Sequence, residues 1–270
     1  MTKLSTFKMP PPRFFPSRKI RSSSSFILPP VLQVCRSLAR NDIINACVRI
    51  FHVTDIVLAS NSPRRRELLA LTQWNFTVSV ADIDESTREN ESPAEYVLRL
   101  AETKARTVAD EMQADRIVLA ADTTVVDGRD ILGKPTSDAE AFAMLTQLRG
   151  RTHQVYTGIA LLRVSDGLLL KELSVTDVPM RAYSDEEIRN YIATRDPFDK
   201  AGAYAIQHAE FHPVENLSGC FAGVMGLALC HVTRMMRKMG IAPNADVPAN
   251  CQKYLDYECP VYGKILNGEL

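Results

Sequence analysis

The stretch DIVLASNSPRRRELLAL (residues 55–71) decides the fold class, because it places a strand directly before a helix. DIVLAS is an apolar run of the length that a buried strand requires. PRRRELLAL is predicted to be a helix with Ser62 as its N-cap and Pro63 at the first helical position. Further strands and helices alternate downstream without a strict βαβ repeat. We therefore predict an α/β fold with a twisted mixed sheet and flanking helices.

The remaining elements follow from apolar periodicity and from helix start signals. Strands are predicted within NFTVSVADID, RIVLAADTTVV, HQVYTGIALLRV and LLLKELSVTDVPMRAY, with a hairpin turn at the DG pair 127–128. Capping boxes at 92–95, 137–140 and 184–187 are predicted to begin three helices. DPFDKAGAYAIQ is predicted to be a loop with strand character at its end, and GVMGLALCHVTRMMRKMG to hold a final helix.

Charge is divided unevenly along the chain. Residues 1–52 contain nine lysines and arginines and one acid, a net charge of +8, so in a neutral chain the remainder carries −8. This basic, Pro- and Ser-rich extension buries too little apolar surface to order itself, although 31–51 is a candidate short helix. We divide the chain into this extension (1–52), a main folded domain (53–240) and a weakly patterned tail (241–270).

The composition excludes several classes of protein. A net-negative body is not typical of a nucleic-acid binder, and no apolar run reaches the roughly 18 residues of a membrane span. The six cysteines form no CxxC pair, which indicates reduced thiols and a cytoplasmic location. The extension is either an organelle-targeting segment or an upstream stretch read from an early start codon.

Three arginines, 64–66, stand at the positive end of the first predicted helix, where the helix dipole favours acids. One interpretation is three solvated surface side chains. The other is an anion site, because a helix start presents free backbone N–H groups that a phosphate would satisfy together with the guanidinium groups.

Two charged residues fall in apolar surroundings. Lys104 lies in the apolar stripe of the helix predicted from 93 to about 112, and either snorkels to solvent or reaches into a cleft. Asp122 lies within the apolar strand RIVLAADTTVV, where burial demands a partner or a metal. It is either a satisfied turn aspartate near a strand end, or a carboxylate that holds a divalent cation or acts as a general base.

Two further lysines lie in predicted loops beside Gly or Pro, where the backbone can approach a ligand closely. They are Lys134 in LGKP and Lys200 in DKAGAYAIQ, the motif that also carries Gln207. With the arginine turn and Lys104, they make four basic sites around one buried acid. This combination indicates a polyphosphate ligand accompanied by a metal ion.

Seven motifs now stand in order: LASNSPRRRELL, DIDES, YVLRLAETKA, LAADTTVV, LGKP, HQVYTG and DPFDKAGAYAIQ. Their order and spacing resemble those of the Maf proteins from about Ile56 to Leu229. The resemblance implies a two-lobed Maf/ITPase-like fold with a deep cleft between the lobes, and a homodimer. It also implies hydrolysis of a nucleoside triphosphate to the monophosphate and pyrophosphate, with Mg²⁺ or Mn²⁺ as cofactor. Neither a membrane nor a stable nucleic-acid partner is expected.

Matched motif by motif, the resemblance also implies roles for individual residues. Asp122 corresponds to the catalytic acid, which either accepts the proton or positions the metal and the water. Glu85 of DIDES corresponds to a second acid that could join it on the metal. Roles in substrate choice are implied for Arg65, Thr123 and Gln207, and a place in the polar lining of the cleft for Ser60, Arg64, Lys104, Lys134 and Lys200.

DKAGAYAIQ resembles the branch that acts on dTTP and UTP, since the branch for 7-methyl-GTP carries an acid in place of this glutamine. A glutamine amide offers a donor and an acceptor to a pyrimidine edge. Ala205 and His208 replace glycines of the family pattern, so we expect a bulkier loop that narrows the cleft or alters base preference. Two alternatives stay open, a pyrophosphatase for 7-methyl-GTP or another modified nucleotide, and a non-catalytic nucleotide-binding regulator of cell division.

Overall fold

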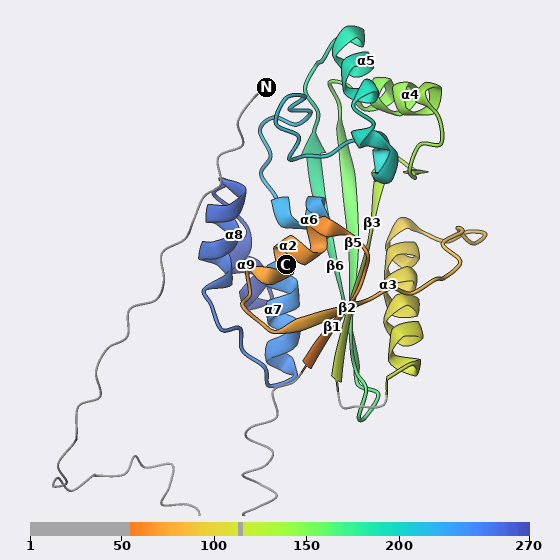
Figure 1. Cartoon of the computed structure of the whole chain (residues 1–270). Helices are drawn as coiled ribbons and strands as arrows, with labels where there is room; N and C mark the ends of the chain where they lie inside the picture. Colours follow the sequence, from red (N-terminus) through yellow and green to blue (C-terminus); the bar gives the residue numbers. More distant parts are fainter. Residues whose placement is uncertain (1–54, 113–115) are drawn as a thin grey trace, which may run out of the picture. The chain divides into compact units, whose positions relative to one another are not determined.

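The structure, a computed structural model, describes residues 55–112 and 116–270 (Figure 1). The predicted extension at 1–52, with its candidate helix at 31–51, lies outside the described residues. In the described part of the chain, no helix combines the length and the apolar character that a membrane crossing requires.

A mixed sheet of six strands confirms the predicted fold class. The strands are β1 (Asp55–Ala59), β2 (Phe76–Ser79), β3 (Arg116–Asp127), β4 (Asp130–Leu132), β5 (Thr152–Arg163) and β6 (Leu169–Pro179). Their order is β2-β1-β3-β5-β6, with β4 paired to β3 through the predicted turn at 127–128. β1 runs parallel to β2 and β3, whereas β5 is antiparallel to both β3 and β6.

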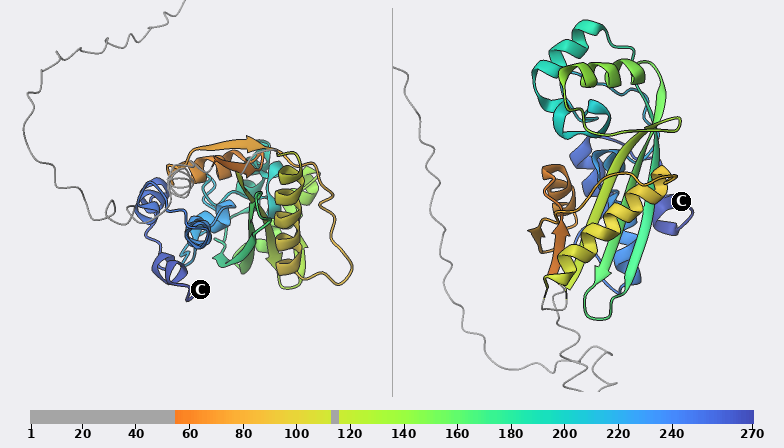
Figure 2. Two further views of the ribbon diagram at one scale, coloured as in Figure 1. Left: turned by 90° about the horizontal axis from the view of Figure 1, so that it is seen from below. Right: turned by 90° about the vertical axis from the view of Figure 1, so that its right-hand side faces the viewer.

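Helices cover both faces of this sheet (Figures 1 and 2). They are α2 (Pro63–Ala70), α3 (Pro93–Asp110), α4 (Asp138–Leu148), α5 (Asp185–Ala193), α6 (Phe221–Met225), α7 (Leu229–Lys238), α8 (Val247–Leu255) and α9 (Tyr262–Asn267). α3 lies alone on one face, and α2 and α6–α9 gather on the other. α4 and α5 pack together at one end of the sheet.

Two of the three predicted capping boxes form, at Ser92–Glu95 and Ser184–Glu187. Only half of the capping box predicted at Ser137 forms. Its hydroxyl accepts a hydrogen bond from the Glu140 N–H, but the Glu140 carboxylate accepts from the N–H and the hydroxyl of Thr136 instead (2.7 Å each). The Glu140 carboxylate binds Thr136 and not the Ser137 N–H because Thr136 presents two donors to one carboxylate oxygen.

The C-terminal third departs further from the sequence predictions. The predicted final helix is divided into α6 and α7, because Gly226 adopts a left-handed conformation (φ 115°) that ends α6. The predicted tail forms α8 and α9, whose Val247, Cys251 and Ile265 join the main apolar core. DPFDKAGAYAIQ contains two short 3₁₀ turns, η3 (Asp196–Asp199) and η4 (Ala201–Ala203), and no strand. The NFTVSVADID strand is shorter than its motif and spans only 76–79.

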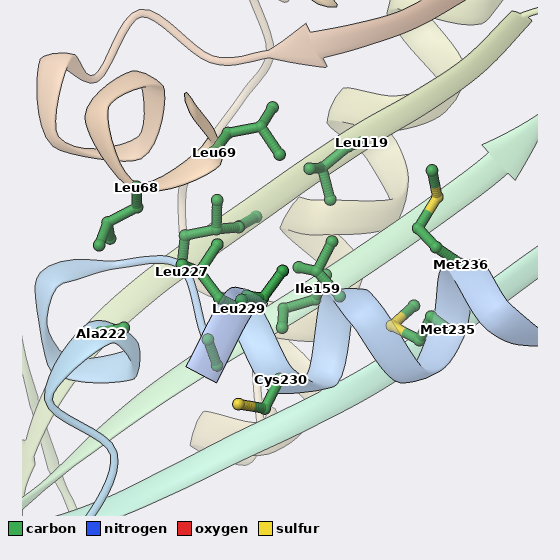
Figure 3. Packing of buried hydrophobic residues seen from close by; sticks show 14 of the residues in the cluster. Leu68, Leu69, Leu119, Ile159, Ala222, Leu227, Leu229, Cys230, Met235 and Met236 are labelled. Atoms are coloured by element: carbon green, nitrogen blue, oxygen red, sulfur yellow. The ribbon is translucent and has the colours of Figure 1, made fainter. Parts of the chain in front are cut away.

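The largest core cluster joins α2, α6 and α7 to the sheet (Figure 3). Leu68 and Leu69 of α2 pack there with Leu119 of β3, Ile159 of β5 and Met235 of α7. Burial of one such side chain contributes about 1.5–3 kcal/mol. The arginine-bearing start of α2 is therefore held against the sheet by the apolar second half of the same short helix.

Helix α3 approaches β5 so closely that only glycine fits at position 158, since an added Cβ would lie 2.5 Å from the Val97 carbonyl oxygen. We expect Gly158→Ala to lower the free energy of unfolding by about 1–3 kcal/mol, measured by urea denaturation. Gly263→Ala in α9, where a Cβ meets no atom within 4 Å, is the matched control and should not destabilise the protein. Equal stability of the Gly158→Ala protein and the wild type would contradict the close approach.

Two histidines are buried in the core, His153 on β5 and His231 on α7. Burial lowers the pKa of both imidazoles to about 4. Between about pH 6.5 and 4 the unfolded chain therefore binds protons that the folded chain does not, and folding stability falls as the pH falls.

We expect the free energy of unfolding to drop between pH 7 and pH 5 by about 1–2 kcal/mol per buried histidine. Urea denaturation of the His153→Gln/His231→Gln double variant should show a flatter pH dependence than the wild type. His212→Gln, at an exposed position, serves as the control and should keep the wild-type slope. An unchanged slope in the double variant would assign the acid lability to other groups.

Candidate active site

The predicted site residues meet where β3 runs on past the end of β1. The last β1–β3 pair is Leu58 with Leu119, and β4 joins β3 only from Val125. Between these two partners, residues 120–124 of β3 lie beyond the carboxyl end of β1, the edge at which open α/β sheets bind ligands. A pocket of about 320 Å³ lies here, lined by residues from α2, α3, β3, the η3–η4 region and α6.

One face of β3 contributes a buried ion pair to this pocket. Lys104 Nζ on α3 lies 2.6 Å from Asp122 Oδ1 and 2.6 Å from Glu85 Oε1. Lys104 is 9% exposed and Asp122 8%, so the lysine does not snorkel to solvent. Asp122 also stands in the middle of a 12-residue strand, which rules out the turn-aspartate interpretation.

The surroundings of Glu85 keep it ionised. Burial raises the pKa of its carboxyl, but the hydrogen bond and the charge of Lys104 outweigh burial, and the pKa lies below its ordinary value. Two carboxylates and one ammonium thus share one corner of the pocket.

The other face of β3 carries the arginine network. The Arg65 guanidinium donates from Nε to the Gly226 carbonyl (2.8 Å), from one terminal nitrogen to Ser60 Oγ (3.3 Å) and from the other to Thr123 Oγ1 (3.2 Å). Burial lowers the pKa of Arg65, although the charge of Asp122 opposes that shift. Thr123 in turn contacts Thr157 Oγ1 at 2.9 Å. Arg65 therefore connects α2, β3 and the end of α6.

Three more cationic side chains reach the pocket, and they differ in how far acidic residues neutralise their charge. Arg64 pairs with Asp199 (3.3 Å), and Lys200 Nζ contacts Asp199 and both the side chain and the carbonyl of Asp196. Lys134 is exposed and forms no ion pair within the described residues. Arg66, the third arginine of the turn, is exposed and lies outside the pocket, so the solvated interpretation holds for it alone.

The structure brings nine of the ten predicted site residues to the pocket lining. They are Arg64, Arg65, Glu85, Lys104, Asp122, Thr123, Lys134, Lys200 and Gln207. The tenth, Ser60, is 6% exposed and lies behind the lining, where its hydroxyl accepts hydrogen bonds from Arg65 and from the Ser62 N–H (3.2 Å). The pocket lining carries five cationic and three acidic side chains, an excess of two positive charges.

Sequence reasoning missed several residues of this site. Tyr96 on α3 donates its hydroxyl to the Glu85 carbonyl (2.8 Å), and burial together with the nearby Asp122 and Glu85 raises its pKa to about 12. Asp199 lies inside the motif DPFDKAGAYAIQ, and its place immediately before Lys200 was the available signal. Gly226 carried no signal for its role, because only its carbonyl oxygen contacts Arg65.

The two residues that replace family glycines, Ala205 and His208, differ in where their side chains lie relative to the pocket. Ala205 lines the pocket, and its N–H donates to the Tyr191 hydroxyl (3.0 Å). His208 is absent from the pocket lining. Its ring packs edge-on against Tyr191, and Nδ1 accepts from the Phe211 N–H (3.0 Å). The bulk of His208 is therefore directed into the neighbouring α5 region, and of the two replacements only Ala205 adds a side chain to the pocket.

The donor set at Lys104 fits a hard divalent cation. Oxygens of Asp122 and Glu85 converge on one point, which the lysine ammonium occupies, and two carboxylates are the usual protein contribution to a Mg²⁺ site. Among the described residues, no group of three or more His, Cys, Asp or Glu side chains could hold a metal ion by itself. A cation held here would therefore draw its remaining ligands from water and from a bound phosphate.

Sequence comparison places these residues in a known family. The profile described as Maf-like protein matches residues 55–239. A dTTP/UTP pyrophosphatase of Methylobacillus flagellatus is 47% identical over 193 residues, 71% of this chain and 96% of its own length. A dTTP/UTP pyrophosphatase of Geobacter sulfurreducens is 46% identical over 186 residues, 68% of this chain and 96% of its own length.

Solved structures are more distant. The dITP/XTP pyrophosphatase of Mycobacterium abscessus superposes with a TM-score of 0.35 at 14% identity, covering 69% of this chain and 94% of that one. The Ham1 protein of Staphylococcus aureus gives a TM-score of 0.34 at 17% identity, covering 47% of this chain and 72% of that one. Structural similarity at this level does not support an assignment of fold family or function. The deep cleft between two lobes stays a prediction.

Proposed function

The chain belongs to the Maf family, and from this premise we propose that it hydrolyses dTTP and UTP to the monophosphate and pyrophosphate. The observation that carries the proposal is the convergence of Lys104, Asp122 and Glu85 at one corner of a pocket that is otherwise rich in cations. A buried carboxyl group that pairs with a lysine beside a phosphate-sized basic pocket is typical of a hydrolase. A protein that only binds nucleotides gains nothing from the desolvation of this acid.

The cations are arranged to receive a triphosphate. Arg64, Lys134 and Lys200 come from three separate segments, and the side chain of Lys134 forms no ion pair within the described residues. A triphosphate carries about four negative charges and its complex with a divalent cation about two, which matches the excess of two positive charges in the lining. Asp199 would yield its contacts with Arg64 and Lys200 to phosphate oxygens when the substrate binds.

Asp122 and Glu85 would hold the Mg²⁺ or Mn²⁺ ion. When bound there, the ion supplies charge neutralisation and a template for the phosphate groups. Because the Lys104 ammonium occupies the point between the two carboxylates, it would move aside when the ion binds there.

The reaction itself is the attack of water on the α-phosphorus. The bond between the α-phosphorus and the bridging oxygen breaks, and pyrophosphate leaves. We assign to Asp122 the orientation of this water and the acceptance of its proton. Arg64, Lys134 and Lys200 stabilise the charge that develops on the leaving pyrophosphate. Arg65 holds the Thr123 side chain on the opposite face of β3 from Asp122 through its hydrogen bond to the threonine hydroxyl.

Base selection is assigned to Gln207, which lines the pocket from the chain segment that follows η4 and is exposed there. Its amide offers one donor and one acceptor to a pyrimidine, whereas a carboxylate would offer acceptors only. Ile206 and Met225 also line the pocket and offer apolar surface to a base.

Asp122→Asn removes the proton acceptor while it keeps the shape of the side chain. We expect pyrophosphate release from dTTP to fall at least about a hundredfold in a protein that stays folded at the assay temperature, because Glu85 remains as a partner of Lys104. Asp130→Asn on the adjoining strand β4, at an exposed position, is the matched control and should retain full activity. Near-normal turnover by the Asp122→Asn protein would refute the role of this residue.

Gln207→Glu tests base selection. We expect kcat/KM for dTTP and UTP to decrease relative to 7-methyl-GTP by roughly tenfold or more, because a carboxylate cannot donate to a pyrimidine acceptor. The measurement is pyrophosphate release for all three nucleotides. Gln73→Glu, an identical change of charge at an exposed turn, should leave the ratios as they are. Unchanged ratios in the Gln207→Glu protein would exclude this residue from base selection.

A further inference from the structure

All four cysteines of the described residues line one small apolar cavity. Cys220 precedes α6 and Cys230 lies on α7, whereas Cys251 lies on α8 and Cys259 follows that helix. Phe221, Leu229 and Leu255 are among the apolar side chains that complete the lining. The Maf-like match ends at residue 239, so two of the thiols belong to the matched domain and two to the segment added after it. All four are free thiols.

Cys259 is the accessible member of this cluster. It is half-buried, while the other three are 6–9% exposed. Burial also raises the pKa of Cys230 to about 12 and of Cys251 to about 11, and raises that of Cys220 further. The thiolate is the reactive form of cysteine, so an oxidant that reaches the cavity from solvent meets Cys259 first.

Cys259 also lies close to Cys220. Its sulfur is 4.0 Å from the carbonyl oxygen of Gly219, the residue bonded to Cys220. Standard backbone geometry places that oxygen within about 3 Å of the Cys220 Cα, so the Cys259 sulfur is within about 7 Å of the same atom. Natural disulfides join residues whose Cα atoms are about 4.4–6.8 Å apart, so closing this bridge requires rotation of both side chains together with a movement of the loop that carries Cys259.

The Cys220 side chain is connected to the nucleotide pocket. Its sulfur caps α6 by accepting a hydrogen bond from the Gly223 N–H (3.3 Å). The Gly223 carbonyl accepts from Thr157 Oγ1 (2.8 Å), and the Gly226 carbonyl at the end of the same five-residue helix accepts from Arg65 Nε (2.8 Å). A change at Cys220 therefore acts on the helix that holds Arg65.

We propose that Cys220 and Cys259 form an oxidation site whose oxidant is a peroxide, and that the resulting disulfide displaces α6 and weakens nucleotide turnover. The Cys259 thiol attacks the peroxide, the O–O bond breaks, and a sulfenic acid and one water form. The Cys220 thiol then attacks the sulfenic sulfur, the S–O bond breaks, and a disulfide and a second water form. The peroxide is reduced by two electrons, which the two thiols supply.

The test is peptide mapping of the full-length protein after treatment with hydrogen peroxide and blocking of residual thiols. Trypsin separates Cys251 from Cys259 at Lys253, and chymotrypsin separates Cys220 from Cys230 at Phe221, Leu227 and Leu229. We expect a cross-linked species between the Cys220 and Cys259 peptides that disappears after treatment with dithiothreitol. A link from Cys259 to Cys251 or Cys230, or stable sulfinic acid at Cys259 with no cross-link, would overturn the proposal.

The disulfide is independent of the proposed function, but its effect on turnover rests on that function. We expect peroxide to lower kcat/KM for dTTP by roughly threefold to tenfold, with recovery in dithiothreitol. Cys259→Ser should abolish this loss, and Cys251→Ala, which removes another thiol from the same cavity, should leave it in place. Formation of the disulfide with unchanged turnover would overturn the coupling to α6. Absence of turnover before oxidation would instead contradict the proposed function. The peptide map would still decide whether the disulfide forms.

Discussion

The ion pair between Lys104 and Asp122 is the constraint on which the site depends. Neither side chain has enough exposure to be solvated by water, so each must find its partner inside the protein, at 2.6 Å. Loss of one partner from such a buried pair costs about 3–5 kcal/mol, because the other charge is left unpaired. The pair ties α3 to β3, and the missing side chain at Gly158 allows α3 to lie close enough to the sheet for this contact.

The sheet topology explains why these residues form a pocket. β1 and β2 are short, so β3 and β5 extend beyond them and leave one edge of β3 uncovered between Leu119 and Val125. Because side chains alternate along a strand, Asp122 and Thr123 point to opposite faces of that edge. Asp122 meets α3 on one face and Thr123 meets Arg65 on the other. A pocket at such a strand edge can therefore combine a buried acid from one face with the Arg65 network from the other.

The segment after the matched domain is built into the same core. α8 and α9 add Val247, Cys251 and Ile265 to the cluster that holds α2 against the sheet. Tyr257 donates its hydroxyl to the carbonyls of Leu217 and Gly219, immediately before α6, and Asn250 donates to the Leu71 carbonyl at the end of α2. Residues outside the Maf-like match thus contact both the end of the helix that carries Arg65 and the segment that leads into α6.

The sequence alone determined those features that depend on local order. Apolar period and capping residues predicted the helices and most strands, the stripe on α3 placed Lys104 inside, and seven ordered motifs indicated the family and nearly all of the pocket lining. Only the tertiary structure decided which charges meet. The partners Arg65 and Gly226 are 161 residues apart, and Lys104 finds Glu85 through a loop without regular structure. Such contacts, the cysteine cavity among them, depend on strand order and on backbone positions that no local pattern records. The helix α8 did carry local start signals, Asp246 as N-cap and Pro248 in the first turn, which the prediction of a weakly patterned tail overlooked.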